Sequence, residues 1–283
     1  MPSATLLGQS VVSGLLTGGL YALLALGLSL SWGLLRLVNL SHFALAFLGA
    51  YLTYQLGTAF HLDPWLSVLA IVPFFFALGV GLHLVFARFR VTEFTSLLVT
   101  FGLTVILESV IQYFWTADFR RYETALSRAS IRVGPLYVPT LELLACLTAA
   151  ALALGTWAWL TFTYIGKALR AAAEDPEIAA VFGVNHRRQA LLVSGVSAAY
   201  AGVAGGYIAL ISTLAPAQLW AWLGVVFAVV IIGGLANPIG ALFAGFLIGV
   251  SESVTMAVVT PAWAPLVSFS VLIALLVFRP GRV

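Results

Sequence analysis

Long apolar runs alternate with short polar stretches along the whole chain, and nine such runs can be delimited. A helix needs about 20 apolar residues to cross the hydrocarbon core of a bilayer. The second and seventh runs are shorter, so we expect them to be tilted, broken or half-spanning. The pattern predicts an all-α fold, a polytopic membrane helical bundle of eight to nine transmembrane segments. The runs are approximately Leu6–Leu35, Phe43–Gly57, Trp65–Phe89, Phe94–Trp115, Thr140–Tyr164, Gln189–Leu210, Trp220–Leu235, Ile239–Val259 and Trp263–Phe278.

The longest charged interruption of this pattern is the stretch from Gly166 to Arg188, which must lie outside the lipid because spans flank it. Within it, Asp175 is suited to cap a helix and Pro176 to occupy the first helical position. Glu177 then lies where the helix dipole favours a negative charge, and Gly183 is a typical helix end. The stretch therefore predicts a short exposed helix.

One face of this short helix is apolar, because Ile178, Val181 and Phe182 fall at positions i, i+3 and i+4. Two interpretations remain open. The face can rest on its own membrane domain or in the lipid headgroups. Alternatively, it can fit a groove on a partner protein.

The composition agrees with a membrane bundle and excludes a soluble protein. Of the 283 residues, 62% are hydrophobic and only 8% are charged, whereas soluble domains carry about 25% charged residues. We expect residues 1–283 to form a single transmembrane domain. The first run is expected to be a retained transmembrane segment, because no basic region precedes it. The lone Cys146 excludes an intrachain disulfide and a cysteine metal site.

The basic residues predict the orientation of the chain in the membrane, because they accumulate in cytoplasmic loops. Four of the thirteen lie in one loop on one side, at Arg120, Arg121, Arg128 and Arg132. The other nine fall on the opposite side, at Arg36, Arg88, Arg90, Lys167, Arg170, Arg187, Arg188, Arg279 and Arg282. This bias places residues 166–188 and the C-terminus in the cytoplasm and the N-terminus outside. Because the charges are scattered among loops, we expect no nucleic-acid partner.

Two polar breaks in the pattern resemble one another, in Arg36–Tyr51 and in Gly233–Gly249. Each has an Asn followed by a segment rich in small residues, and each adjoins a short run. Interrupted segments in matching positions of two halves indicate an inverted repeat with the transport path at its interface. At the first break, Asn39 or Ser41 is expected to cap the second helix.

Three acids lie within apolar runs, at Glu108, Glu142 and Glu252. A membrane-embedded acid indicates a functional site, or else a hydrogen-bonded carboxyl that fixes helix packing. Glu142 is close enough to the membrane boundary to be solvated. Together with the polar breaks, these acids lead to a candidate translocation pathway formed by Asn39, Ser41, His42, Asn237, Pro238 and Glu252.

No constellation of residues indicates an enzyme. The four His residues fall at different depths without metal-ligand spacing, and the known hydrolase, zinc-protease and nucleotide-binding motifs are absent from the sequence. We therefore expect no catalytic residue, no metal and no cofactor bound by this chain.

Four stretches resemble permeases of the branched-chain amino acid ABC-importer family. The first, Gly166–Leu210, contains GKALRAAAEDPEIAAVFGVN and is similar to the family's cytoplasmic loop and following helix. Tyr21–Tyr51 resembles the family's N-terminal pattern, Phe227–Glu252 its late Gly-rich block, and Phe278-Arg279-Pro280 its C-terminal ending. One departure concerns Phe43-Ala44, where the family commonly has Gly-Glu after the His.

This resemblance implies a permease subunit of a bacterial inner-membrane importer, multi-pass, with its N-terminus periplasmic. It would form the translocation pathway for branched-chain amino acids or related small polar solutes. Its partners would be a second permease, identical or not, two cytoplasmic ABC ATPases that bind ATP and Mg, and a periplasmic substrate-binding protein. The short helix would be the ATPase-coupling segment, made by Glu174, Asp175, Pro176, Glu177, Ile178, Ala179, Ala180, Val181, Phe182 and Gly183.

The alternative function is a secondary transporter or channel that works without ATPases. Such a protein would place ionisable groups near the membrane midplane, where Glu108 and Glu252 are the candidates. It would leave the short exposed helix unexplained, and co-purification of an ATPase subunit separates the two hypotheses.

Overall fold

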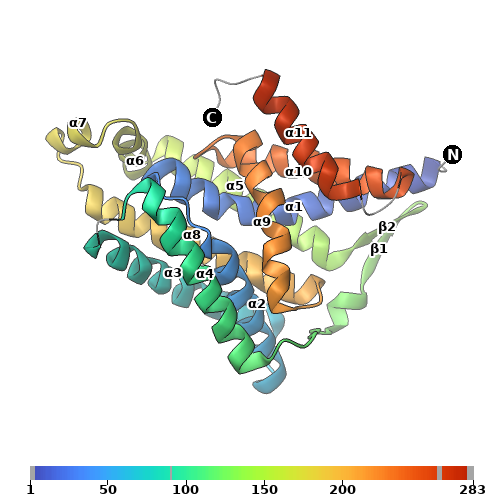
Figure 1. Cartoon of the computed structure of the whole chain (residues 1–283). Helices are drawn as coiled ribbons and strands as arrows, with labels where there is room; N and C mark the ends of the chain where they lie inside the picture. Colours follow the sequence, from blue (N-terminus) through green and yellow to red (C-terminus); the bar gives the residue numbers. More distant parts are fainter. Residues whose placement is uncertain (1–3, 90, 260–262, 279–283) are drawn as a thin grey trace.

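The computed structural model describes residues 4–89, 91–259 and 263–278 of the chain (Figure 1). Helices make up nearly all of the described chain, so the predicted all-α bundle is confirmed. The elements, in order, are α1 (Ala4–Leu35), α2 (Ser41–Ala59), α3 (Pro64–Arg88), α4 (Glu93–Trp115), η1 (Ala125–Arg128), β1 (Ser130–Val133), β2 (Leu136–Pro139), α5 (Thr140–Phe162), α6 (Tyr164–Glu174), α7 (Pro176–Val181), α8 (His186–Ile211), η2 (Pro216–Gln218), α9 (Leu219–Gly233), α10 (Pro238–Val258) and α11 (Ala264–Phe278).

Seven helical segments of the described chain are long and apolar enough to cross a membrane, fewer than the eight to nine expected. The two that fall short are α2, with 19 residues that include His42 and Gln55, and α11, with 15 residues. Most of α2 is buried against other helices rather than exposed to lipid. A helix shielded in this way can carry polar residues, because neighbouring protein groups replace the lipid around it. The seventh apolar run, which contains α9, is long enough to span because η2 extends the helix to residues 216–233.

α1 is the helix around which the others are packed, with α10, α5, α8 and α9 against it. At 1.5 Å per residue its 32 residues span about 48 Å. This length exceeds the roughly 30 Å of a hydrocarbon core, so α1 extends beyond the membrane.

Glycines allow α1 and α10 to approach with their backbones in contact. A Cβ added to Gly18 would lie 2.4 Å from the carbonyl oxygen of Gly245, and one added to Gly14 would lie 2.6 Å from the Cα of Val250. Both distances are too short for any larger residue. The small residues that the sequence places on these two segments therefore serve close helix packing.

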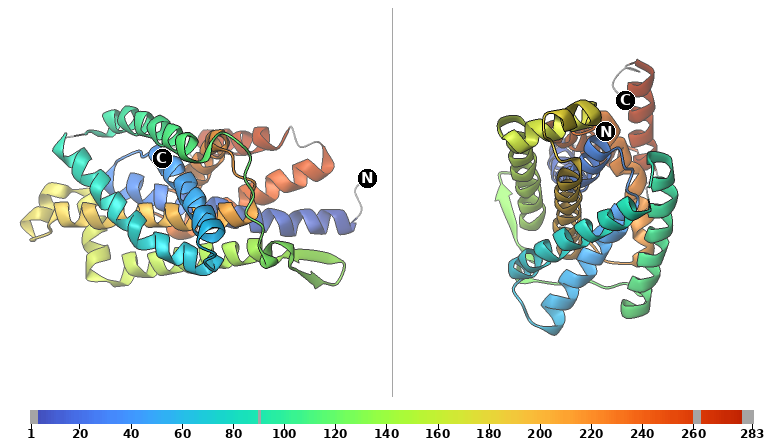
Figure 2. Two further views of the ribbon diagram at one scale, coloured as in Figure 1. Left: turned by 90° about the horizontal axis from the view of Figure 1, so that it is seen from below. Right: turned by 90° about the vertical axis from the view of Figure 1, so that its left-hand side faces the viewer.

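The bundle has two distinct ends (Figure 2). α6 and α7 lie at one end, where the Nη2 of Arg36 donates a hydrogen bond of 3.1 Å to the carbonyl of Ala173. At the other end, near the start of α1, Gln9 is joined to the backbone of Tyr137 in β2. Its Nε2 donates to the carbonyl at 2.8 Å, and its Oε1 accepts from the amide at 2.9 Å.

β1 and β2 form an antiparallel hairpin at this second end, in the loop that carries the smaller set of basic residues. The sequence analysis did not predict it. Val133 pairs with Leu136, so the turn has only two residues. Gly134 adopts φ +61 there, a conformation that glycine reaches without steric cost.

The basic residues divide between the two ends as the sequence predicts. Arg36, Arg88, Lys167, Arg170, Arg187 and Arg188 belong to the end that carries α6 and α7, whereas Arg120, Arg121 and Arg132 belong to the hairpin end. Arg90, Arg279 and Arg282 lie outside the described residues.

We expect the hairpin end to face the outside of the cell, because the larger basic set marks the cytoplasmic side. Single cysteines at Arg132→Cys and His186→Cys, each in a Cys146→Ser background, test this on whole cells. Both native side chains are exposed, so a membrane-impermeant thiol reagent should label Arg132→Cys and leave His186→Cys unlabelled. The reverse pattern would invert the orientation.

Candidate functional site

α6 is an amphipathic helix that lies across one end of the bundle. Its first turn is capped by Thr163, whose Oγ1 accepts from the amide of Gly166 at 3.0 Å. Its apolar face is buried, and Leu169 packs with Leu160 of α5 and Val193 of α8. α6 is therefore fixed to the membrane bundle and holds the adjoining α7 in place.

α7 has the termini that the sequence predicts. The Oδ1 of Asp175 accepts hydrogen bonds of 3.0 Å from the amides of both Glu177 and Ile178, and Pro176 occupies the first turn. At the other end Gly183 has φ +82, and its amide donates to the carbonyl of Ala180 at 2.9 Å. The predicted capped helix is confirmed, apart from Phe182, which follows its last residue.

The apolar face of α7 is open to the surroundings. Ile178 is 58% exposed, Val181 84% and Phe182 77%, whereas Ala179 is buried. These three side chains are thus not packed against the described part of their own chain. These side chains can therefore contact either lipid headgroups or a partner protein.

A hollow of about 420 Å³ adjoins this face, between α6 and α7. Ile178, Phe182 and Tyr164 line it together with the charged residues Lys167 and Glu174. A mainly apolar hollow with a few charged groups, at the end of a membrane bundle, suits the insertion of a protein side chain.

The first polar break differs from its prediction. The residue before α2 is Leu40, and neither Asn39 nor Ser41 caps the helix with its side chain; instead the Oγ of Ser41 donates to the Oδ1 of Asn39 at 2.5 Å. The amides of His42 and Phe43 donate instead to the backbone carbonyls of Asn39 and Leu40, each at 3.3 Å. Hydroxyls of α4 bind the chain just before the helix, where the amide of Val38 donates to Ser96 at 3.2 Å and that of Leu40 to Thr100 at 3.0 Å.

At the second polar break, an Asn side chain does cap the following helix, as expected for an N-cap residue. The Oδ1 of Asn237 accepts from the amide of Gly240 at 3.0 Å, and its Nδ2 donates to the carbonyl of Gly233 at 3.1 Å. Pro238 occupies the first turn of α10. The amide of Ala236 donates to the carbonyl of Ser29 at 3.2 Å, which ties this break to α1. Both breaks therefore lie near the same end of α1, and the inverted repeat stays a prediction.

His42 is fully buried and joins α2 to α1. Its Nε2 is 3.0 Å from the carbonyl oxygen of Leu24, and its Nδ1 has no hydrogen-bond partner among the described residues. The ring lies so close to Gly27 that a Cβ there would be 2.4 Å from the ring carbon Cε1. This arrangement is a tight helix contact rather than an open path.

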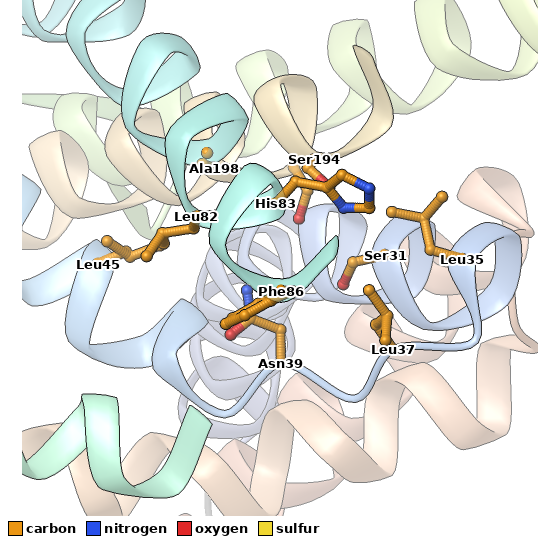
Figure 3. Close-up of a pocket in the computed structure, with 12 residues that line it drawn as sticks. Ser31, Leu35, Leu37, Asn39, Leu45, Leu82, His83, Phe86, Ser194 and Ala198 are labelled. Atoms are coloured by element: carbon orange, nitrogen blue, oxygen red, sulfur yellow. The ribbon is translucent and has the colours of Figure 1, made fainter. Parts of the chain in front are cut away.

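Figure 3 shows the enclosed cavity beside Asn39, between α1, α3 and α8. Its volume is about 20 Å³, which is room for one water molecule and far too little for an amino acid. His83 lies on its wall, with Nδ1 at 3.0 Å from the Oγ of Ser194. His83 also lines a wider opening of about 270 Å³ that reaches Arg187 at the α6–α7 end.

Glu252 lies apart from both breaks, buried between three helices. Its exposed fraction is 5%. Oε2 accepts a hydrogen bond of 2.8 Å from the hydroxyl of Tyr21 in α1, and Oε1 accepts one from Ser268 in α11. The ring of Tyr21 in turn contacts Trp222 of α9 edge-on, at 5.8 Å between centroids. The carboxyl group therefore ties α11 to the rest of the bundle.

The sequence matches the profile of the branched-chain amino acid transport system permease component over residues 10–276. The chain belongs to this family. A permease of this family is a transport protein rather than an enzyme, and the chain is a multi-pass membrane protein with seven candidate spans in its described part.

Individual relatives of this permease align over nearly their whole length. The high-affinity branched-chain amino acid transport system permease protein LivH of Salmonella typhimurium is 24% identical, with 96% of this chain and 93% of the relative covered. The probable branched-chain amino acid transport permease protein LivH of Methanocaldococcus jannaschii is 28% identical, with 97% and 92% covered. BraD of Pseudomonas aeruginosa, another high-affinity permease protein of this kind, is 22% identical, with 96% and 94% covered. No solved structure matches the chain significantly.

The permease brings only part of the candidate pathway together. Asn39, Ser41 and His42 adjoin one another, and Asn237 with Pro238 lies near the same end of α1, whereas Glu252 belongs to a separate cluster. Sequence reasoning missed the polar residues that surround these positions. Tyr21 and Ser268 bind Glu252, and Ser96 and Thr100 bind the amides beside Asn39. His83 and Ser194 bind each other on the wall of the pocket that Asn39 also lines. The α4 hydroxyls could have been identified from the sequence, because Ser96, Thr100 and Thr104 recur every four residues on one face of an apolar helix.

Replacing Glu252 with Leu should destabilise the permease, because the Tyr21 and Ser268 hydroxyls would lose their acceptor. Each such unsatisfied group costs about 1–3 kcal/mol, so the apparent Tm in detergent should fall by about 5 °C or more. Glu252→Gln keeps a polar side chain of the same length and should lose less. As a control, Met256→Leu changes a half-exposed residue of the same helix. If Glu252→Leu and this control are equally stable, the hydrogen bonds of Glu252 to Tyr21 and Ser268 do not stabilise the bundle.

Proposed function

We propose that this permease is the membrane subunit of an ATP-driven importer in the bacterial inner membrane. It forms the translocation pathway for branched-chain amino acids or related small polar solutes. Family membership supports this function, as does the similarity to LivH and BraD, which are high-affinity branched-chain amino acid transport system permease proteins. The near-complete alignment of those relatives with this chain supports a shared architecture.

The observation that carries the proposal is the exposed apolar face of α7. Ile178, Val181 and Phe182 are more than half exposed on a capped helix outside the spans, beside an apolar hollow. Exposed apolar surface of this kind is typical of a site for a partner protein. We assign α7 as the coupling helix, which fits a groove of a cytoplasmic ABC ATPase and transmits its movement to the bundle through α6.

The remaining partners follow from the same assignment. Two ATPase subunits bind ATP and Mg and supply the energy, and this chain binds neither. A second permease, identical or not, completes the membrane core. A periplasmic substrate-binding protein delivers the solute at the hairpin end.

A secondary transporter or channel explains the permease less well. It needs no cytoplasmic partner, so the apolar face of α7 would have no role. Glu252, one of its two candidate ion-coordinating acids, has both carboxyl oxygens engaged by hydroxyls of its own chain.

Phe182→Asp should release the ATPase subunits while leaving the bundle folded, because Phe182 contributes to the exposed face rather than to the core. Burying a Phe is worth about 1.5–3 kcal/mol, and each 1.4 kcal/mol changes affinity tenfold. We therefore expect about ten- to hundredfold weaker retention of the ATPases in a pull-down of the assembled complex, with loss of ATP-driven uptake in liposomes.

The matched control is Phe119→Asp, the same change at a residue that is 76% exposed at the opposite end of the bundle. It should retain the ATPases as the unmodified protein does. If Phe182→Asp also retains them and couples ATP hydrolysis to uptake normally, α7 is not the coupling helix and its face contacts the membrane surface.

A further inference from the structure

The outward surface of α4 carries polar side chains within a membrane-spanning helix. Glu108 is half-buried, and Ser109 and Gln112 are exposed. The buried face of this helix, which packs on α2, is formed instead by residues such as Thr100 and Thr104. The polar residues on the outward surface are therefore not part of this contact with α2.

Glu108 lies too deep to be solvated by the headgroups. It precedes the last residue of α4, Trp115, by seven positions, which is about 10 Å along the helix axis. A carboxyl group and an amide that face hydrocarbon at this depth are costly, and polar groups within spans therefore face protein or water. The surface around Glu108 and Gln112 is thus not a lipid-facing surface.

The carboxyl group of Glu108 is held in a fixed position by two neutral donors. The Nε1 of Trp220 donates to Oε2 at 3.0 Å, and the Nε2 of Gln112 donates to Oε1 at 3.3 Å. No Lys or Arg in the described part of the chain pairs with it. The carboxyl group is therefore oriented by its neighbours but lacks a positive partner. It is also more accessible than Glu252, which is enclosed by helices of its own chain.

An apolar surface adjoins this carboxyl group on the same helix. Phe101 and Val105 precede Glu108 by seven and three residues, so they lie on the same side. They are 48% and 42% exposed, and the ring of Phe101 contacts that of Trp220 at 5.7 Å. A negative group beside exposed apolar side chains complements a molecule that combines an ammonium group with an aliphatic chain.

Resting on the proposed import function, we propose that the α4 surface formed by Phe101, Val105, Glu108 and Gln112 lines a water-filled path. Within this path the Glu108 carboxylate binds the ammonium group of the transported amino acid, and Phe101 and Val105 contact its aliphatic side chain. Water and the passing ammonium group then provide the solvation that lipid would deny to the carboxylate. The alternative is a dry contact between this surface and a second permease. In that case the second permease would have to supply a cation to pair with Glu108.

The water-filled path is tested by cysteine reactivity in the complete complex, assembled with its ATPases in liposomes and carrying Cys146→Ser. A small water-soluble methanethiosulfonate reacts with thiols only where water reaches them. Gln112→Cys and Val105→Cys should react, and L-leucine with its binding protein should slow the reaction. The matched control is Ile106→Cys, a residue that is 60% exposed on the other side of α4, and it should stay unreactive.

The ammonium contact is tested by Glu108→Gln, which keeps the size of the side chain and one oxygen that can accept from the Nε1 of Trp220 but removes the charge. Uptake of L-leucine at subsaturating concentration should fall about tenfold, the scale of a lost charged hydrogen bond, with the ATPases retained. Glu93→Gln, at an exposed acid in the first turn of the same helix, should transport at the unmodified rate.

Three results would overturn the inference in different ways. If Gln112→Cys and Val105→Cys are as unreactive as Ile106→Cys, the surface faces lipid or is dry. Reactive cysteines with normal uptake by Glu108→Gln would refute the ammonium contact. If the unmodified complex takes up no leucine at all, the branched-chain amino acid assignment fails and the ammonium assignment fails with it, whereas the labelling pattern still decides whether the surface is wet.

Discussion

The absence of hydrogen-bonding solvent inside a bilayer is the constraint on which this structure depends. Wherever the helical backbone is interrupted within the bundle, side chains or neighbouring backbone must replace the lost partners. At the first break, Ser96 and Thr100 of α4 accept from the amides of Val38 and Leu40. At the second, Asn237 binds both sides of the break. α4 is therefore held to the bundle through the polar groups of the break as well as through apolar packing.

The same constraint explains why α1 is central. Both breaks adjoin its end, and Gly18 and Gly14 bring its backbone against that of α10. Without a hydrophobic driving force between helices in lipid, such close packing and a few buried hydrogen bonds must hold the bundle together. The length of α1 also matters, because the helix reaches both ends of the bundle. Gln9 near its start binds the hairpin, and Arg36, directly after its end, binds α6. One rigid helix thus joins the two ends of the protein.

The sequence predicted those features that depend on local chemistry. The spans follow from apolar run length, and the capped α7 follows from Asp175, Pro176 and Gly183 within ten residues. The expected side-chain cap of α2 was wrong because backbone carbonyls accept from the first amides of the helix. The hydroxyls that bind the break before it come from α4, nearly sixty residues later, and no local rule reveals them. For the same reason the partners of Glu252, on α1 and α11, could not be identified from its neighbours in sequence. The hairpin was missed because its loop was judged by charge, although the alternation of Ile131 and Val133 with Arg132 is typical of a strand.

Two membrane-embedded acids show how the surroundings, rather than the residue type, decide a role. Sequence reasoning treated Glu108 and Glu252 alike, since each lies in an apolar run. Glu252 is only 5% exposed and is enclosed by three helices, so a passing solute cannot reach it. Glu108 also accepts hydrogen bonds on both oxygens, from an indole and an amide, but it lies on a surface that the bundle leaves open. A transport protein that moves a charged solute needs a group of the second kind, because only a carboxylate that the solute can reach can bind and release it.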